Sequence, residues 1–160
     1  MLERYSIFAS VGNATQPFDR FLRMVDEAAG RTGLRTLIQT GSGRFRPQHA
    51  EAASFVTQEL FEALMQEADY IVTHAGEGSV MAAVRLGKVP IVVPRRKAAG
   101  EHVNDHQLEL ADEFSRMGWC CVVADVGELI ACLRTRPEVG PVREDISNRR
   151  MREIVSEFIG

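Results

Sequence analysis

The segment 68–79 has the residue types of an anion-binding turn. Residues 70–73 are apolar, as in a buried strand, and residues 80–86 have the spacing of a helix. Five residues of interest lie between or beside them: His74, Gly76, Glu77, Gly78 and Ser79. Glycines let the backbone approach a ligand, and the free N–H groups at a helix N-terminus suit a phosphate. The alternative is an ordinary strand-to-helix turn in which glycine only relieves a steric conflict.

Further motifs follow in a recognisable order. Residues 87–94 read Gly-Lys-Val-Pro-Ile-Val-Val-Pro, which is typical of a helix end followed by a strand. A basic stretch starts at Arg95, and residues 101–107 read Glu-His-Val-Asn-Asp-His-Gln. Together with the strand-like segments 7–12 and 37–41, this order resembles the C-terminal, donor-binding domain of glycosyltransferase family 28. It looks most like the free-standing small subunits of bipartite UDP-sugar transferases, including those of exopolysaccharide synthesis.

The resemblance implies a binding site for a UDP-sugar. Gly12 and Asn13 would line the cleft, and the turn from Gly76 to Ser79 would hold the diphosphate. Ser79 is also placed to cap the helix that follows. His106 and Gln107 fall where the family contacts the donor sugar. The Gln107 amide offers a donor and an acceptor to sugar hydroxyls; its alternatives are a helix cap or a solvent-facing side chain.

The roles of four basic residues are open. His74 is interpreted as a structural or binding residue rather than as a general base. Arg95 is the basic residue expected to carry phosphate charge, and its alternative is a solvated cation. His102 and His106 are four residues apart, but they fall in a loop-like stretch, and the chain has no Asp-x-Asp motif. We therefore expect no metal site and no cofactor.

One position departs from the family pattern. Family members place an acidic residue, which clasps the ribose hydroxyls, in the helix after the glycine turn, where this chain has Ala82. Either Glu77 or Glu101 replaces it, or nucleotide affinity is lower, or the chain is a degenerate partner.

Composition and periodicity place these motifs in one α/β domain. The 160 residues are 45% hydrophobic and 26% charged, with a net charge of -3, which gives no reason to expect nucleic acid as a partner. Strands are expected at 5–11, 34–40, 51–57, 70–73, 90–93 and 119–123, and helices at 17–29, 59–68, 80–86, 105–117, 126–134 and 142–159. This alternation predicts a Rossmann-like doubly wound parallel sheet. The family resemblance implies that this sheet is equivalent to the C-terminal half of a GT-B glycosyltransferase.

The family resemblance implies that this chain is the donor-binding half of a two-domain enzyme. Residues 1–134 would form the donor-binding domain, and residues 135–160 a linker and a helix that packs on the domain or on a partner. The acceptor site and the catalytic base would then belong to a second, membrane-associated subunit. We find no apolar span or signal peptide, and the odd number of cysteines argues against disulfides, so the chain is expected in the cytoplasm, recruited to the inner face of the membrane by its partner. Without its partner, the isolated chain could form a homodimer. The alternative function is that of a non-catalytic scaffold, which stabilises or recruits a membrane-associated transferase.

Overall fold

The protein folds around a single parallel sheet. The computed structural model describes residues 4–13, 15–102 and 104–135. Its six strands are β1 (Ile7–Ser10), β2 (Thr36–Gln39), β3 (Glu51–Ala53), β4 (Tyr70–Thr73), β5 (Ile91–Val92) and β6 (Cys121–Val122), in the order β3-β2-β1-β4-β5-β6. All pairings are parallel. The strand order reverses direction between β1 and β4, which confirms the doubly wound fold predicted from the sequence.

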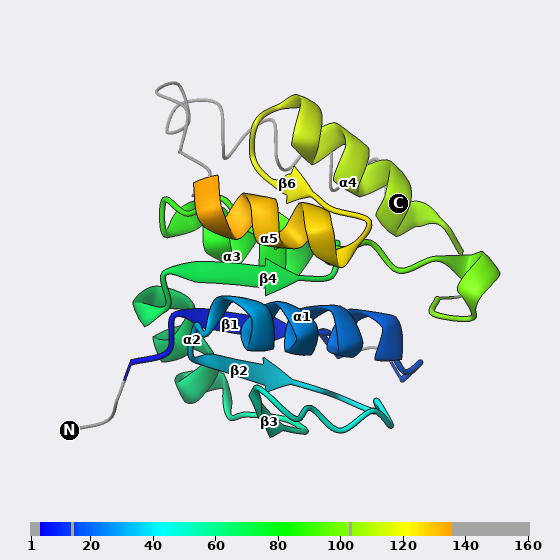
Figure 1. Cartoon of the computed structure of the whole chain (residues 1–160). Coiled ribbons are helices and arrows are strands. Elements are labelled where there is room, and N and C mark those ends of the chain that lie inside the picture. Colours follow the sequence, from blue (N-terminus) through cyan, green and yellow to red (C-terminus); the bar gives the residue numbers. More distant parts are fainter. Residues whose placement is uncertain (1–3, 14, 103, 136–160) are drawn as a thin grey trace.

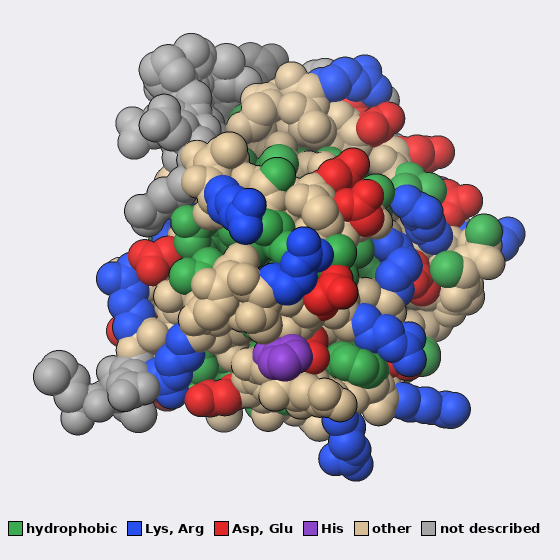
Figure 2. Space-filling view, in the orientation of Figure 1, with side chains coloured by type: hydrophobic (Ala, Val, Ile, Leu, Met, Phe, Trp, Pro, Cys, Tyr) green, Lys and Arg blue, Asp and Glu red, His purple; other side chains and the backbone are tan. Residues whose placement is uncertain are grey.

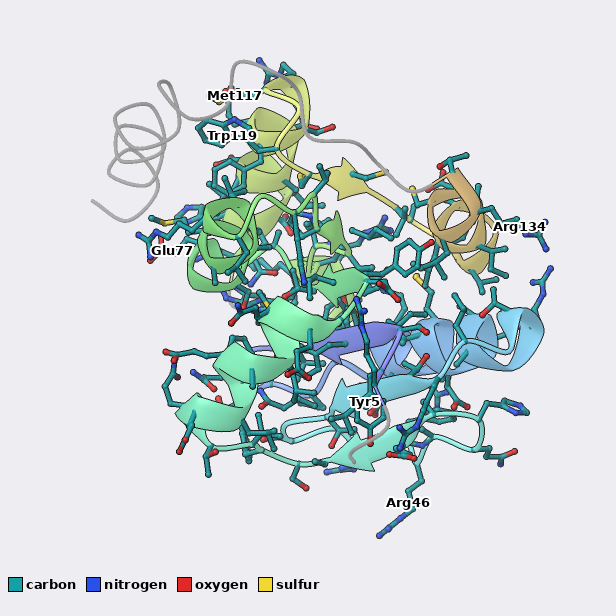
Figure 3. The ribbon with its side chains drawn as sticks, turned by 90° about the vertical axis from the view of Figure 1, so that its left-hand side faces the viewer. Tyr5, Arg46, Glu77, Met117, Trp119 and Arg134 are labelled. Atoms are coloured by element: carbon teal, nitrogen blue, oxygen red, sulfur yellow. The ribbon has the colours of Figure 1, made fainter. Side chains whose placement is uncertain are left out.

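Helices cover both faces of the sheet (Figure 1). They are α1 (Asp19–Thr32), α2 (Gln58–Glu67), α3 (Glu77–Arg85), α4 (His106–Arg116) and α5 (Val126–Thr135), with a short 3-10 turn η1 (Lys97–Ala99). Turned by 90°, the molecule shows α1 and α5 on one side of the sheet and α2, α3 and α4 on the other (Figure 3). The helix expected at 142–159 and the linker before it lie outside the described residues.

The core follows from the alternation of side chains along each strand. In β1, Ile7 and Ala9 pack with the apolar residues of α1 and α5, whereas Phe8 packs with Leu64 and Ala83 under α2 and α3. Strands buried on both faces are nearly all apolar, which explains why these short segments could be recognised in the sequence. The polar residues Ser10 and Gln39 end β1 and β2.

The start of α3 differs from the sequence-based prediction. The helix begins at Glu77 rather than near Val80, because the carbonyl of the extended Gly76 already accepts the N–H of Val80. No side chain caps this end, so the prediction that Ser79 caps the helix is wrong. The glycine turn is therefore itself the first turn of the helix.

Charged side chains of both signs are spread over the face that carries α1 and α5 (Figure 2). No single basic patch dominates that view. The three cysteines are free, and only Cys120 is buried. The sulfur atoms of Cys121 and Cys132 lie 2.6 Å apart.

A buried carboxylate fixes the edge of the sheet. Asp26 of α1 is 4% exposed and accepts hydrogen bonds of 2.8–3.1 Å from three backbone N–H groups of the chain that leads into β3. The donors belong to Gln48, His49 and Ala50. Asp26 thus ties the edge strand to a helix that is anchored in the core.

We predict that Asp26→Ala lowers the free energy of unfolding by about 3 kcal/mol, because it leaves three backbone donors without their charged acceptor. Urea unfolding followed by circular dichroism measures this loss. Glu27→Ala, an exposed acidic position next to it on the same helix, is the matched control and should change stability by less than about 0.5 kcal/mol. Equal effects of the two variants would show that Asp26 does not hold the edge.

Candidate functional site

A groove of about 650 Å³ opens at the carboxyl edge of the sheet, between α2 and α3. Its floor is formed by the ends of β1 and β2 and the loop after β1, and its walls by the two helices. The lining residues are Ser10, Gly12, Asn13, Gln39, Val56, Gln58, Phe61, Glu62, Met65, Gln66, Gly78, Ser79, Ala82, Arg85 and Leu86. The groove thus lies at the point where the strand order reverses, which is where a doubly wound sheet binds its ligand.

The N-terminus of α3 is open toward this groove. The N–H groups of Glu77, Gly78 and Ser79 belong to the first turn and have no partner within the helix, and no side chain caps them. A Cβ atom built on Gly78 would meet nothing within 4 Å. The helix dipole and these donors make this end suited to an anion. Partial burial raises the pKa of Glu77, the first residue of the helix.

His74 is packed into the edge of the sheet and does not line the groove. Its ring lies against two glycines: a Cβ atom on Gly12 or on Gly76 would stand 2.2 Å from a ring atom. Gly12 also has a φ of 76°, which favours glycine. These two glycines are therefore explained by the imidazole, whereas no atom of the described residues crowds the position of a side chain at Gly78.

Gln107 connects His74 to Arg95. Its side-chain oxygen accepts the backbone N–H of Arg95 at 3.0 Å, so its amide nitrogen faces Nδ1 of His74, at 3.1 Å. This network assigns the imidazole proton to Nε2. Gln107 is 8% exposed, and both ends of its amide are used within the protein. The predicted contact with a donor sugar, and the solvent-facing alternative, both disagree with this geometry.

Arg95 is fully buried and has the role of a clamp. Its guanidinium donates hydrogen bonds to the carbonyl oxygens of Gln16 and Val11 at 2.8 Å and of Glu101 at 2.9 Å, and it stacks over Phe18. Burial lowers the pKa of Arg95, and the carboxylate of Glu101 opposes this shift. Neither the predicted phosphate contact nor a solvated cation fits, because the guanidinium already binds the loops around the groove.

Glu101 is likewise engaged within the protein. Its carboxylate receives two hydrogen bonds from the Arg20 guanidinium, at 2.9 and 3.0 Å, and a third from the backbone N–H of Arg96 at 3.0 Å. With 5% exposure, it cannot reach a ribose in this arrangement. Glu101 therefore does not replace the carboxylate that is missing at Ala82.

Eight of the eleven predicted site residues separate into two groups, and Gly76 and Glu77 are not among the residues that line the groove. Gly12, Asn13, Gly78 and Ser79 line the groove, whereas His74, Arg95, Glu101 and Gln107 form the buried network behind it. His106 is exposed at the first position of α4 and is not among the lining residues. His102 precedes that helix, so it shares no helix face with His106.

The floor of the groove and its α2 wall were not predicted from the sequence. Gln39 binds the Ser10 hydroxyl at 3.2 Å and accepts the N–H of Val56 at 3.1 Å, which positions the loop before α2. Polar residues that end otherwise apolar strands were the available signal for Ser10 and Gln39. No comparable signal marked Glu62 on α2.

Within the described residues no cluster of three or more histidine, cysteine or acidic side chains could hold a metal ion. Across the same part of the chain, no helix has the length and apolar character of a membrane span.

The pKa of His74 is lowered to about 3, first by burial and then by the positive charge of Arg95. Between this value and about pH 6.5, the unfolded chain binds a proton that the folded chain does not. The contribution of His74 to the free energy of unfolding is therefore fully present above about pH 6.5. It decreases as the pH falls, by about 2 kcal/mol between pH 7 and pH 5.

We predict that His74→Asn removes this part of the pH dependence, as measured by urea unfolding of both proteins at pH 7 and pH 5. In the wild type, NMR should find the imidazole neutral at pH 5. An equal loss of stability in the variant, or a protonated imidazole at pH 5, would contradict the assignment.

Comparison with known proteins agrees with this architecture. The family model of the glycosyltransferase family 28 C-terminal domain matches residues 6–135. The "UDP-N-acetylglucosamine transferase subunit ALG13" of Yarrowia lipolytica is 32% identical over 124 residues, covering 69% of this chain and 61% of that protein. The human protein of the same name is 30% identical over 125 residues, covering 70% of this chain but 10% of its own length. The chain therefore spans between a tenth and three fifths of these two relatives.

Solved structures show the same fold. An NMR solution structure of ALG13 matches with a TM-score of 0.62 and 21% identity, over 93% of this chain and 95% of that one. The calicheamicin glycosyltransferase CalG4 matches with a TM-score of 0.60 and 20% identity, over 98% of this chain and 39% of its own. From the family match and the shared fold, the chain belongs to the glycosyltransferase family 28 C-terminal domains.

Proposed function

We propose that this chain is the donor-binding subunit of a bipartite, inverting UDP-sugar glycosyltransferase. The observation that carries the proposal is the uncapped first turn of α3, which opens onto the groove between α2 and α3. The diphosphate would lie on the N–H groups of Glu77, Gly78 and Ser79. The nucleoside would extend along the groove, where Val56, Phe61 and Met65 supply apolar surface beside polar side chains.

The proposed role of this chain in glycosyl transfer is to stabilise negative charge on the leaving group. When an acceptor hydroxyl displaces UDP at the anomeric carbon, negative charge develops on the departing diphosphate. Fixed N–H dipoles at a helix N-terminus stabilise this charge without reorganising. The His74 imidazole is buried, neutral and occupied by Gln107, so it supports no role as base. The acceptor and the base would come from a second polypeptide, which we place at the membrane surface.

The relatives named above supply the first donor to test, UDP-N-acetylglucosamine. The acceptor would be a lipid-linked glycan at the cytoplasmic face of the membrane. The chain would then act in the assembly of a glycan such as an exopolysaccharide. The C-terminal segment expected from the sequence at 135–160 would dock on the domain or on the partner.

A non-catalytic scaffold is the second candidate. Ala82, which offers no hydrogen bond to a nucleotide, is the observation that favours it. A scaffold would bind no UDP, and the activity of its partner would survive changes at the α3 turn.

We predict that Gly78→Asp lowers the affinity for UDP at least about tenfold relative to Gly78→Asn, because the added carboxylate repels the diphosphate across a short distance. The position is exposed and has room for a side chain, and a carboxylate is favourable at a helix N-terminus, so the fold should be kept. Titration calorimetry with UDP, without metal and then with Mg²⁺, measures the affinities. Equal binding by the Asp and Asn variants would place the diphosphate elsewhere.

A further inference from the structure

The two walls of the groove, α2 and α3, begin at the same edge of the sheet, so residues equally far from the two helix starts lie at similar positions along the groove. Helices α2 and α3 each follow a strand of one parallel sheet, so both begin at the carboxyl edge and run back along the same face. Glu62 lies four residues after the start of α2, and Ala82 five residues after the start of α3, which is roughly 6 to 8 Å along each helix. Both residues line the groove.

The far end of the groove is fixed by a lysine. Nζ of Lys88, in the turn after α3, donates hydrogen bonds to the carbonyl oxygens of Met65, Gln66 and Ala68 at 2.6–2.7 Å. These carbonyls belong to the C-terminal end of α2, where helix carbonyls need partners. The separation of the two walls is therefore held by the protein itself.

Glu62 is an oriented carboxylate on the α2 wall. One of its oxygens accepts a hydrogen bond of 3.0 Å from the side-chain amide of Gln58, one turn earlier and also in the groove. Among the described residues it has no other hydrogen bond and no ion pair. A carboxylate has about four acceptor positions, so most of its capacity remains for a ligand.

We propose that Glu62 binds the ribose hydroxyls of the nucleotide from across the groove, opposite Ala82. The inference rests on the proposed function, because a diphosphate on the first turn of α3 places the ribose about one turn along the groove. A vicinal diol donates two O–H groups, which one carboxylate accepts together, and acidic residues bind ribose in this way in other doubly wound folds.

The test uses two ligands on the full chain, UDP and 2′-deoxy-UDP, with affinities from titration calorimetry. The wild type should bind UDP about tenfold more tightly than 2′-deoxy-UDP. In Glu62→Ala this ratio should fall to near one, because the carboxylate that reads the hydroxyl is gone. Glu59→Ala removes an exposed acidic side chain of the same helix outside the groove and should keep the ratio. Equal thermal midpoints show that both variants remain folded.

A second variant tests the position directly. Glu62→Ala combined with Ala82→Glu returns a carboxylate to the same depth from the opposite wall and should restore the preference for UDP. If the wild type binds UDP and Glu62→Ala keeps the ratio, the role of Glu62 is refuted while the proposed function stands. If the wild type binds no UDP, the proposed function fails and the inference with it.

Discussion

The buried guanidinium of Arg95 holds together the loops at the carboxyl edge of the sheet. Arg95 has no exposed surface, and a buried guanidinium must be matched by acceptors. Three backbone carbonyls supply them, one at the end of β1, one in the loop before α1 and one in the loop before α4. Glu101 adds a carboxylate nearby, which in turn binds Arg20 of α1. The loops around the groove are thereby fixed to one another by the fold, before any ligand arrives.

The contacts of Arg95 also explain why glycine stands at positions 12 and 76. The backbone N–H of Arg95 orients Gln107, and Gln107 orients the His74 ring against Gly12 and Gly76. This arrangement keeps the imidazole neutral and away from the groove. Charged and aromatic side chains hold the loops in place, and the first N–H groups of α3 have no side-chain cap. In the function we propose, these N–H groups and the helix dipole would bind the anion, and the binding surface would be preorganised.

The sequence predicted the framework well because its signals are local. Short apolar strands alternating with amphipathic helices set the parallel sheet, and the turn at Gly78 was recognised from its neighbours. The roles of Arg95, Glu101 and Gln107 could not be predicted in this way. Each depends on contacts with distant segments, such as Val11 and Arg20, and nothing in the local pattern distinguishes a buried arginine from a solvated one.

The contribution of α2 was hidden for a related reason. Loss of the acidic residue at Ala82 could be read from the sequence, whereas a replacement on the opposite wall depends on the relative placement of two helices. Glu77 and Glu101 were the natural candidates because they are close in sequence to the motifs. The fold instead brings Glu62 to the groove, from a helix without a motif.

The most direct test of the central claim is an NMR titration of the isotope-labelled chain with UDP. We expect the largest amide shifts at Glu77, Gly78 and Ser79, with further shifts along the groove at Asn13 and Gln58. Shifts confined to the basic stretch from Arg96 to Gly100, with the first turn of α3 unaffected, would contradict it. In that case the diphosphate would be held by the exposed basic side chains rather than by the N-terminus of the helix.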